Sequence, residues 1–259
     1  MTDNLLKFEL RRMFCGKALY ICSAVCAVIA VLGGLVILLA MKLIAPQIEN
    51  IPDVYVSDMM LGFMSNAEIA VISGIFVSVF ACADHSEHTV KNIYARGFSR
   101  SALYGCEYVS AVIGTAFIFA VSELVSFAFY SAVFDMGKIG ATHVALLASQ
   151  FVYLIAVNTF VFAVCMMTKK TVLGIVTAVL GCSVVDIVLS LVSSVVNSSR
   201  GIYGNSSFDI GKYWLSSIAG DFGTVETEAK AIILDLALCV AYIVAFTVAG
   251  VLVNRKDEV

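Results

Sequence analysis

Six long apolar stretches dominate the sequence and constrain what it can fold into. They span residues 18–41, 66–83, 102–133, 142–167, 172–196 and 231–253. A helix needs about 20 mostly apolar residues to cross the roughly 30 Å hydrocarbon core of a bilayer. The chain is 61% hydrophobic and only 14% charged, and a soluble domain of this length has no core large enough to bury so much apolar surface. The sequence therefore predicts one all-α integral membrane domain over residues 1–259, with six transmembrane helices.

Two of these stretches carry further signals. Ser65-Asn66-Ala67-Glu68 has the Ser-x-x-Glu pattern of a capping box, so we expect the second helix to begin at Asn66 with Glu68 in its first turn. The third stretch, residues 102–133, is longer than one crossing requires. Its length predicts either a strongly tilted helix or an interfacial turn.

Basic residues concentrate on one side of the predicted bundle. With six crossings, residues 1–17, 84–101, 168–171 and 254–259 share a side, which holds eleven of the sixteen basic residues. They are Lys7, Arg11, Arg12, Lys17, Lys91, Arg96, Arg100, Lys169, Lys170, Arg255 and Lys256. The positive-inside rule then places both termini in the cytoplasm. On the other side, residues 197–230 form a loop rich in Ser, Gly and Asn, in which Tyr213 and Trp214 are expected interface anchors.

The N-terminal segment, residues 4–17, predicts an amphipathic helix ahead of the first span. Its apolar positions recur at i, i+4, i+7 and i+8, and its basic side chains lie off that stripe. The apolar positions are Leu6, Leu10, Met13 and Phe14, and the basic ones are Lys7, Arg11 and Arg12. Such a helix is suited to lying among lipid headgroups before the chain turns into the membrane. The simpler alternative is a basic anchor that only sets orientation.

The segment between the second and third spans, residues 84–101, predicts a short helix that projects into the cytoplasm. Val90, Ile93 and Tyr94 share one helix face. Gly97 is placed to end this helix, and Ser99 to cap the next one. A short capped amphipathic helix of this kind is more typical of a docking surface than of a linker.

The same loop carries a resemblance to a known family. The run Thr89-Val90-Lys91-Asn92-Ile93…Arg96-Gly97-Phe98-Ser99-Arg100 resembles the intracellular loop of type-2 ABC exporter permeases. It is most similar to the bacterial bacitracin/lantibiotic-immunity and sodium-export group, which usually shows Gly-Thr-Ile-Lys-Asn…Gly-Tyr-Ser-Arg there. His88 stands where that pattern has Gly, and Glu107 stands where a Lys often opens the third span.

The resemblance implies roles for both elements on the basic side. Residues 4–17 would be a connecting helix, through Leu6, Leu10, Arg11, Arg12, Met13 and Phe14. The loop would hold the coupling helix that contacts a separate ABC ATPase, through Val90, Lys91, Asn92, Ile93, Tyr94, Arg96, Gly97, Ser99 and Arg100. The resemblance also implies a bacterial cytoplasmic membrane, a second permease copy or paralogue, and an antimicrobial peptide, another amphiphile or sodium as substrate.

The nucleotide is expected on the partner. A P-loop needs Gly-x-x-x-x-Gly-Lys-Ser/Thr, because its backbone amides hold the phosphates, and no such run occurs in the sequence. We therefore expect no catalytic residue and no directly bound cofactor, with ATP and Mg held by the ATPase subunit. The net charge of −3 gives no reason to expect nucleic acid as a partner.

Carboxylates inside the predicted spans are further candidates, because an ionisable group in a bilayer is costly and commonly functional. Asp186 lies near the middle of the fifth span and Glu123 beyond the middle of the third, with Asn158 as a candidate partner. They either line a transport pathway or make hydrogen bonds between helices. Asp235 is expected to serve the helix dipole at the start of the sixth span, and Glu107 to reach water near the end of the third.

Two other function classes stay open. A proton- or cation-coupled secondary transporter would use Asp186 or Glu123, but it predicts inverted repeats and broken midplane helices, and Pro46 and Pro52 both lie outside the spans. An intramembrane enzyme would need histidine in a span, and no span interior contains one. The eight cysteines are expected to be reduced. His85 and His88 are expected to be solvated loop residues, so no metal site is predicted.

Overall fold

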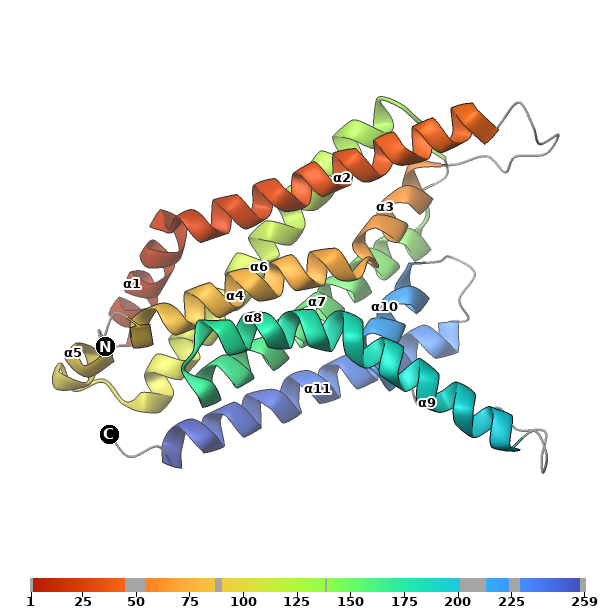
Figure 1. The fold of residues 1–259 in the computed structure, drawn as a ribbon. Coiled ribbons are helices and arrows are strands. Elements are labelled where there is room, and N and C mark those ends of the chain that lie inside the picture. Colours follow the sequence, from red (N-terminus) through yellow and green to blue (C-terminus); the bar gives the residue numbers. More distant parts are fainter. Residues whose placement is uncertain are drawn as a thin grey trace.

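The computed structural model is a helical bundle whose long helices run side by side (Figure 1). It describes residues 2–44, 55–86, 90–137, 139–200, 213–223 and 229–256. Within these residues, six helices are long and apolar enough to cross a membrane. The predicted helical fold class and six spans are confirmed, and the chain has the build of a multi-pass membrane protein.

The membrane-length helices lie within a few residues of their predicted bounds. They are α2 (Lys17–Ile44), α4 (Ala67–Ser86), α6 (Arg100–Ser131), α7 (Ala141–Thr168), a composite of α8 (Thr171–Val179), the π-helical turn η2 (Leu180–Val184) and α9 (Val185–Arg200), and finally α11 (Ala229–Lys256). The described residues also contain shorter helices, namely α1 (Thr2–Cys15), α3 (Val56–Met64), α5 (Val90–Ala95) and α10 (Leu215–Phe222). The sequence patterns did not predict α3 or α10.

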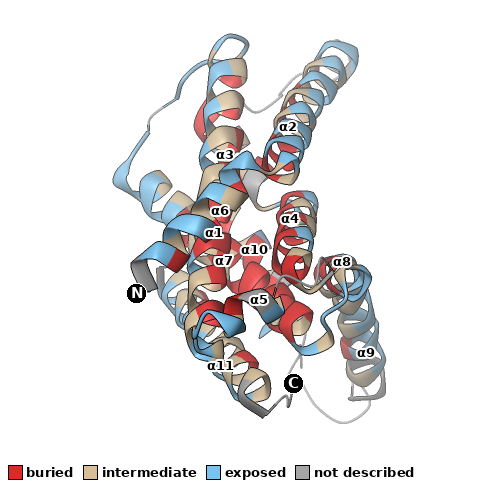
Figure 2. Cartoon of the chain, turned by 90° about the vertical axis from the view of Figure 1, so that its left-hand side faces the viewer, coloured by how far each residue is buried: buried red, intermediate tan, exposed pale blue. Residues whose placement is uncertain are grey.

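The centre of the bundle is formed by α4 and α7. Their most apolar windows are 61% buried inside the protein, against 11% for α11, and Figure 2 shows the buried residues gathered on these central helices. The outer helices α2, α8, α9 and α11 expose large apolar side chains such as Leu39, Val172, Val195 and Ile233. Exposed apolar surface on this scale is suited to contact with lipid tails.

The third span is a single unbroken helix. With 32 residues, α6 is about 48 Å long, which exceeds the hydrocarbon thickness and favours the tilted alternative over an interfacial turn. The chain turns only after Ser131, where the Phe134 amide donates to the Tyr130 carbonyl at 2.8 Å. The Tyr130 hydroxyl donates to the Ala30 carbonyl at 3.1 Å and so joins α6 to α2.

The second span begins one residue later than predicted, at Ala67. Ser65 follows the last residue of α3, and its hydroxyl donates to the Gly62 carbonyl at 2.9 Å. Glu68 is exposed in the first turn of α4. Because Ser65 closes the preceding helix, the apparent capping box reflects the end of one helix and the start of another.

Small residues bring helices close together without a GxxxG pair. A Cβ placed on Gly174 of α8 would lie 2.2 Å from Cys165 Sγ on α7 and 2.6 Å from Ser78 Oγ on α4. A Cβ on Gly114 of α6 would lie 2.4 Å from the Phe76 ring. Single glycines therefore allow the close helix contacts on which membrane bundles depend.

The predicted basic side corresponds to one end of the bundle. Helices α1 and α5, the junction of α7 with α8, and the C-terminal end of α11 lie at the same end (Figure 1). Lys169, at the α7–α8 junction, adopts a left-handed conformation with φ of 54° and caps α7 through its amide and the Cys165 carbonyl. We call this the basic end and its counterpart the opposite end.

Candidate functional site

At the basic end, α1 and α5 meet around a small apolar cluster. Leu5 of α1, Ile93 of α5 and Leu103 of α6 are buried together. Partly buried neighbours complete the cluster, namely Val90, Tyr94, Phe98 and Cys106. The two elements that the sequence predicted separately therefore form one continuous surface.

Helix α1 is docked on the bundle through a face that shares Met13 with the predicted apolar stripe but is turned toward Leu5 and Glu9. Its buried positions are Leu5, Glu9 and Met13, which recur at i, i+4 and i+8. Leu6 and Leu10 are half-buried, and Phe14 is 40% exposed, with its ring edge against Phe117. Contact with α6 rotates the helix so that an acidic residue, Glu9, lies in the docked face.

Glu9 belongs to a buried group of four charged side chains, which we call the charged centre: Glu9 and Arg12 of α1, Asp84 of α4 and Glu107 of α6. One oxygen from each of the three carboxylates lies within 4.8 Å of the others. Arg12 pairs with Glu9 at 2.8 Å and also with Asp84. The Arg12 guanidinium lies 4.6 Å from the Phe80 ring centroid and donates to the Phe80 carbonyl at 3.4 Å.

The charged centre corrects two expectations. Glu107 is 1% exposed and so does not reach water, because the docking of α1 covers this end of α6. Arg12 points into the bundle instead of out to the lipid headgroups. The sequence does carry one signal for the centre, since Glu9 stands four residues from both Leu5 and Met13 and therefore shares their buried face.

Burial shifts the titration of Glu9, which lies outside the membrane-spanning helices. The pKa of the Glu9 carboxyl is raised from 4.5 to about 7. Desolvation by burial raises this pKa, the positive charge of Arg12 lowers it, and the charge of Asp84 raises it. Desolvation is the largest of these effects because the side chain is fully buried. A carboxyl in this state holds its proton at mildly acidic pH and releases it near neutrality.

The loop helix α5 has the predicted ends. The Gly97 amide donates to the Tyr94 carbonyl at 2.9 Å, and Gly97 itself has φ of 84°, a conformation that favours glycine. Ser99 caps α6, because its hydroxyl accepts from the Ala102 amide at 3.2 Å. Both caps lie on the same side of α5 and fix the turn that joins it to α6.

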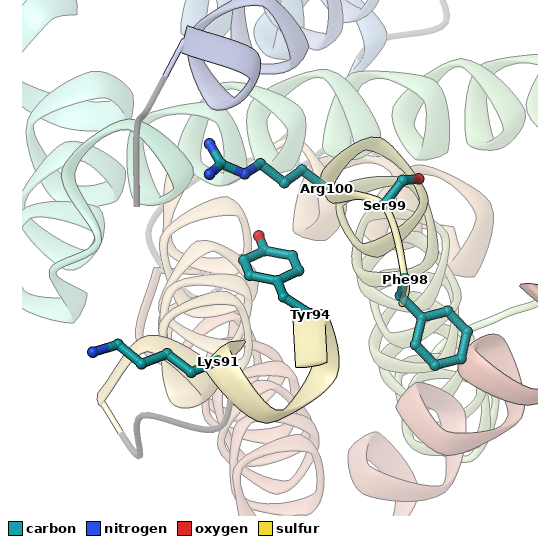
Figure 3. A pocket seen from close by; sticks show the side chains of 5 residues that line it. All are labelled: Lys91, Tyr94, Phe98, Ser99 and Arg100. Carbon is teal, nitrogen blue, oxygen red and sulfur yellow. The ribbon is translucent and has the colours of Figure 1, made fainter. Parts of the chain in front are cut away.

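The outer face of α5 is basic and borders a hollow of about 490 Å³ (Figure 3). The Arg100 guanidinium carbon lies 5.8 Å from the Tyr94 ring centroid, and in Figure 3 Lys91 lies on the other side of that ring. The hollow is lined by Lys91, Tyr94, Phe98, Ser99 and Arg100. The positive charges of Lys91 and Arg100 beside this hollow suit an acidic group on a partner.

The proposed coupling residues fall into an inner and an outer set. Ile93 is 9% exposed and Val90 packs beside it, so both hold α5 against α1 and α6. Lys91 and Arg96 are exposed and available to a partner. The Asn92 side chain and residues 87–89, which include His88, lie outside the described residues.

Asn158 pairs with neutral groups. Its amide nitrogen donates to Thr115 Oγ1 of α6 at 2.9 Å, and its amide oxygen accepts from Ser73 Oγ of α4 at 3.2 Å. Its amide therefore joins α4, α6 and α7, and these contacts show the interhelical alternative for this residue. The Asp186 side chain lies outside what the structure describes, so its expected pairing with Asn158 stays a prediction.

The two candidate pathway acids have different settings. Both carboxylate oxygens of Glu123 are buried without a hydrogen-bond partner in the described part of the chain. Asp186 is the second residue of α9, directly after the π-helical turn η2, and its side chain lies outside what the structure describes. Asp235 is 1% exposed and is the seventh residue of α11. The helix dipole acts on charges in the first turn, and Asp235 lies beyond that turn, so the expected dipole role is wrong.

At the opposite end, two side chains hold short helices in place; the sequence reasoning missed Gln150 and assigned Trp214 only to a membrane interface. The Gln150 amide nitrogen donates to the carbonyl of Leu61 on α3 at 2.8 Å and to that of Phe222 on α10 at 2.9 Å. The Trp214 indole donates to the Gly181 carbonyl of η2 at 2.9 Å. A π-helical turn disturbs the regular hydrogen-bond ladder, so Trp214 stabilises the bend rather than only anchoring an interface.

The eight cysteines are all free thiols, as predicted. They are Cys15, Cys22, Cys26, Cys82, Cys106, Cys165, Cys182 and Cys239.

Comparison with known proteins adds no family: no protein-family model matches the chain, and no curated protein matches it. The functional argument therefore rests on the bundle, its basic end and the loop sequence.

Proposed function

We propose that this protein is the membrane-spanning permease subunit of an ATP-driven ABC exporter of a bacterial cytoplasmic membrane. The observation that carries the proposal is the packing of α1 and α5 into one surface, with Ile93 buried beneath and Lys91 and Arg96 exposed above. A helix that is capped at its end and packed against both α1 and α6 passes a force to both of them. This arrangement suits a contact through which a separate subunit drives the bundle.

The loop sequence supplies the identity of the partner. Its likeness to type-2 exporter permeases favours an ABC ATPase, which holds ATP and Mg, and a second permease copy or paralogue beside this chain. Both termini would then be cytoplasmic, and the basic end would face the ATPase. The substrate class that fits this group is an amphiphilic compound such as an antimicrobial peptide.

The test is co-purification in mild detergent with a charge-reversed loop. Because Ile93 is buried, deleting the loop would disturb the fold, so the informative change is the double variant Lys91→Glu with Arg96→Glu. The matched control is Lys42→Glu, an exposed lysine in the last turn of α2 at the opposite end. A P-loop ATPase should co-purify with the wild type and with the control. The amount that co-purifies with the double variant should be at least about tenfold lower. An ATPase missing from the wild type, or retained equally by the double variant, would contradict the proposal.

A second candidate is a proton- or cation-coupled secondary transporter that uses Asp186 or Glu123. It is favoured by the buried oxygens of Glu123, which lack hydrogen-bond partners among the described residues. Under this alternative, purified protein in vesicles moves substrate along an ion gradient without ATP, and Glu123→Gln abolishes that movement. Under the exporter proposal, transport requires ATP and the ATPase subunit.

A further inference from the structure

The charged centre contains more acid than its arginine neutralises. Three carboxylates face one guanidinium, and the side chains of Glu9 and Asp84 are 0% and 3% exposed. Even with Asp84 left aside, ionised Glu9 and Glu107 together with Arg12 carry a net charge of −1. Buried charge that is not paired is strongly unfavourable, so the centre is stable only when it takes up positive charge.

The oxygen atoms show where a proton fits. Oε1 of Glu107 and Oε1 of Glu9 are buried and make no hydrogen bond within the described residues. A protonated carboxyl gains an O–H donor that a neighbouring carboxylate oxygen accepts. The Glu107 and Asp84 side chains are hydrogen-bond partners, and two carboxyl groups form such a bond only when one of them holds a proton. One proton in the centre therefore also reduces the repulsion among the three clustered carboxylates.

The other ionisable groups around the centre come from every element packed on it. Helix α1 supplies Arg12, and α4 supplies Asp84 with half-buried His85 next to it. Helix α6 supplies Glu107 and the buried hydroxyl of Tyr104, and Tyr104 also faces Gly250 of α11. Lys17, at the start of α2, is exposed. Arg12 forms ion pairs with the carboxylates of Glu9 and Asp84.

We propose that the charged centre is a proton-controlled latch, which holds α1 on α4 and α6 when protonated and releases it when the carboxylates ionise. Release of α1 also removes Leu5 from beneath Ile93 and so loosens the loop helix α5. The latch does not require the exporter assignment, because its parts all lie in this chain.

The direction of the pH dependence follows from Glu9. Its pKa is about 7 in the docked helix because of burial, against the ordinary 4.5 in a released, solvated helix. The docked state therefore binds the proton more tightly, so docking is strongest below about pH 4.5 and weakens as the pH rises through about 7. The difference between a Glu9 pKa of about 7 in the docked helix and 4.5 in the released helix changes the docking equilibrium constant by roughly 300-fold between low pH and pH above about 7.

The experiment is hydrogen exchange of the full chain in lipid nanodiscs between pH 5 and pH 8, corrected for intrinsic exchange rates. Peptides from α7 serve as the internal reference for the folded bundle. In the wild type, protection of residues 2–15 should fall at least about tenfold as the pH rises, while α7 stays protected. Glu9→Gln, which resembles the protonated acid, should keep α1 protected at both pH values. Lys7→Gln, an exposed change on the same helix, should keep the wild-type profile.

Three outcomes would overturn the latch. The first is α1 protection that does not depend on pH in the wild type. The second is a wild-type pH dependence of α1 protection in both Glu9→Gln and Glu107→Gln. If one of these variants folds poorly, the same result in the other is sufficient. The third is full protection of α1 at pH 8 when millimolar Mg²⁺ is added, which would identify the centre as a cation site. Because no ATPase is present, failure of the latch is distinguishable from failure of the proposed function.

Discussion

The two ends of the bundle are held together by different chemistry. At the basic end, α1 is fixed by ion pairs between Arg12 and the carboxylates of Glu9 and Asp84. At the opposite end, α3 and α10 are fixed by neutral hydrogen bonds from the Gln150 amide. Ionic contacts respond to pH and to the loss of one partner, whereas neutral hydrogen bonds do not titrate. The difference suggests that the basic end is built to change state and the opposite end to stay fixed.

The sharpest way to break this comparison is Arg12→Gln, which leaves the buried carboxylates without their cation. Removing one partner of a buried ion pair costs about 3–5 kcal/mol. We expect a loss of this size in the free energy of unfolding at pH 5, where α1 is docked, measured in mixed micelles. Arg11→Gln, an exposed change on the same helix, should cost less than about 0.5 kcal/mol. Equal effects of the two variants would show that the ion pairs do not hold this end.

Glu9→Gln should act in the other direction at high pH. The wild-type carboxyl, with its pKa raised to about 7 by burial, contributes stability that is present at low pH and lost as the pH rises through about 7. A neutral amide keeps that stability, so the variant should be more stable than the wild type at pH 8 by up to about 3 kcal/mol. The gain should be smallest at pH 5. Loss of stability at both pH values would contradict the account.

At the opposite end, Gln150→Leu should be destabilising but independent of pH. The substitution removes the side-chain donor to the Phe222 and Leu61 carbonyls, although Leu61 keeps the Ser65 amide as a donor at 3.2 Å. We expect a cost of about 2 kcal/mol. The same loss at pH 5 and pH 8, measured by unfolding in mixed micelles, would sharpen the contrast with Glu9. A control is Ser149→Ala, since the Ser149 hydroxyl donates only to the Ala145 carbonyl of its own helix at 2.9 Å.

Trp214→Phe isolates the hydrogen bond at the π-helical turn. The ring is kept, but the donor to the Gly181 carbonyl is lost, so we expect a cost of about 1 kcal/mol. Hydrogen exchange should increase around residues 180–184 and not at α1. Tyr213→Phe, at an exposed side chain, should leave exchange there unchanged.

The smallest effect is expected from Ser99→Ala, which removes the N-cap of α6. Loss of such a cap costs about 1 kcal/mol or less, and the change should appear as faster exchange at residues 100–103. No change there would show that the cap does not fix the junction between α5 and α6.

The spans were predictable because their length and apolarity are properties of single stretches. The bounds of α2, α7 and α11 differ from the predicted ones by at most three residues. The caps at Gly97 and Ser99 were also predictable, since each depends on a local conformation. The spans and caps were predictable because each depends on residues that are neighbours in the sequence.

The charged centre was not predicted, because its members lie far apart in the chain and meet only after packing. Arg12 and Asp84 are 72 residues apart in the chain, and the apolar stripe of α1 shares Met13 but not Leu5 or Glu9 with the buried face. Trp214 fits an interface anchor equally well from sequence alone, because only the folded chain shows the Gly181 carbonyl beside it. Long-range pairing therefore decides the parts of the site that the sequence left open.

The central claim, that the basic end docks an ATPase, is tested most directly by photo-crosslinking in intact membranes. A photoreactive residue replaces Lys91 on α5 or, as the control, Lys42 at the opposite end, and crosslinked products are identified by mass spectrometry. The proposal predicts a P-loop ATPase crosslinked from position 91 and not from position 42. No ATPase from position 91, or equal capture from both positions, would contradict it.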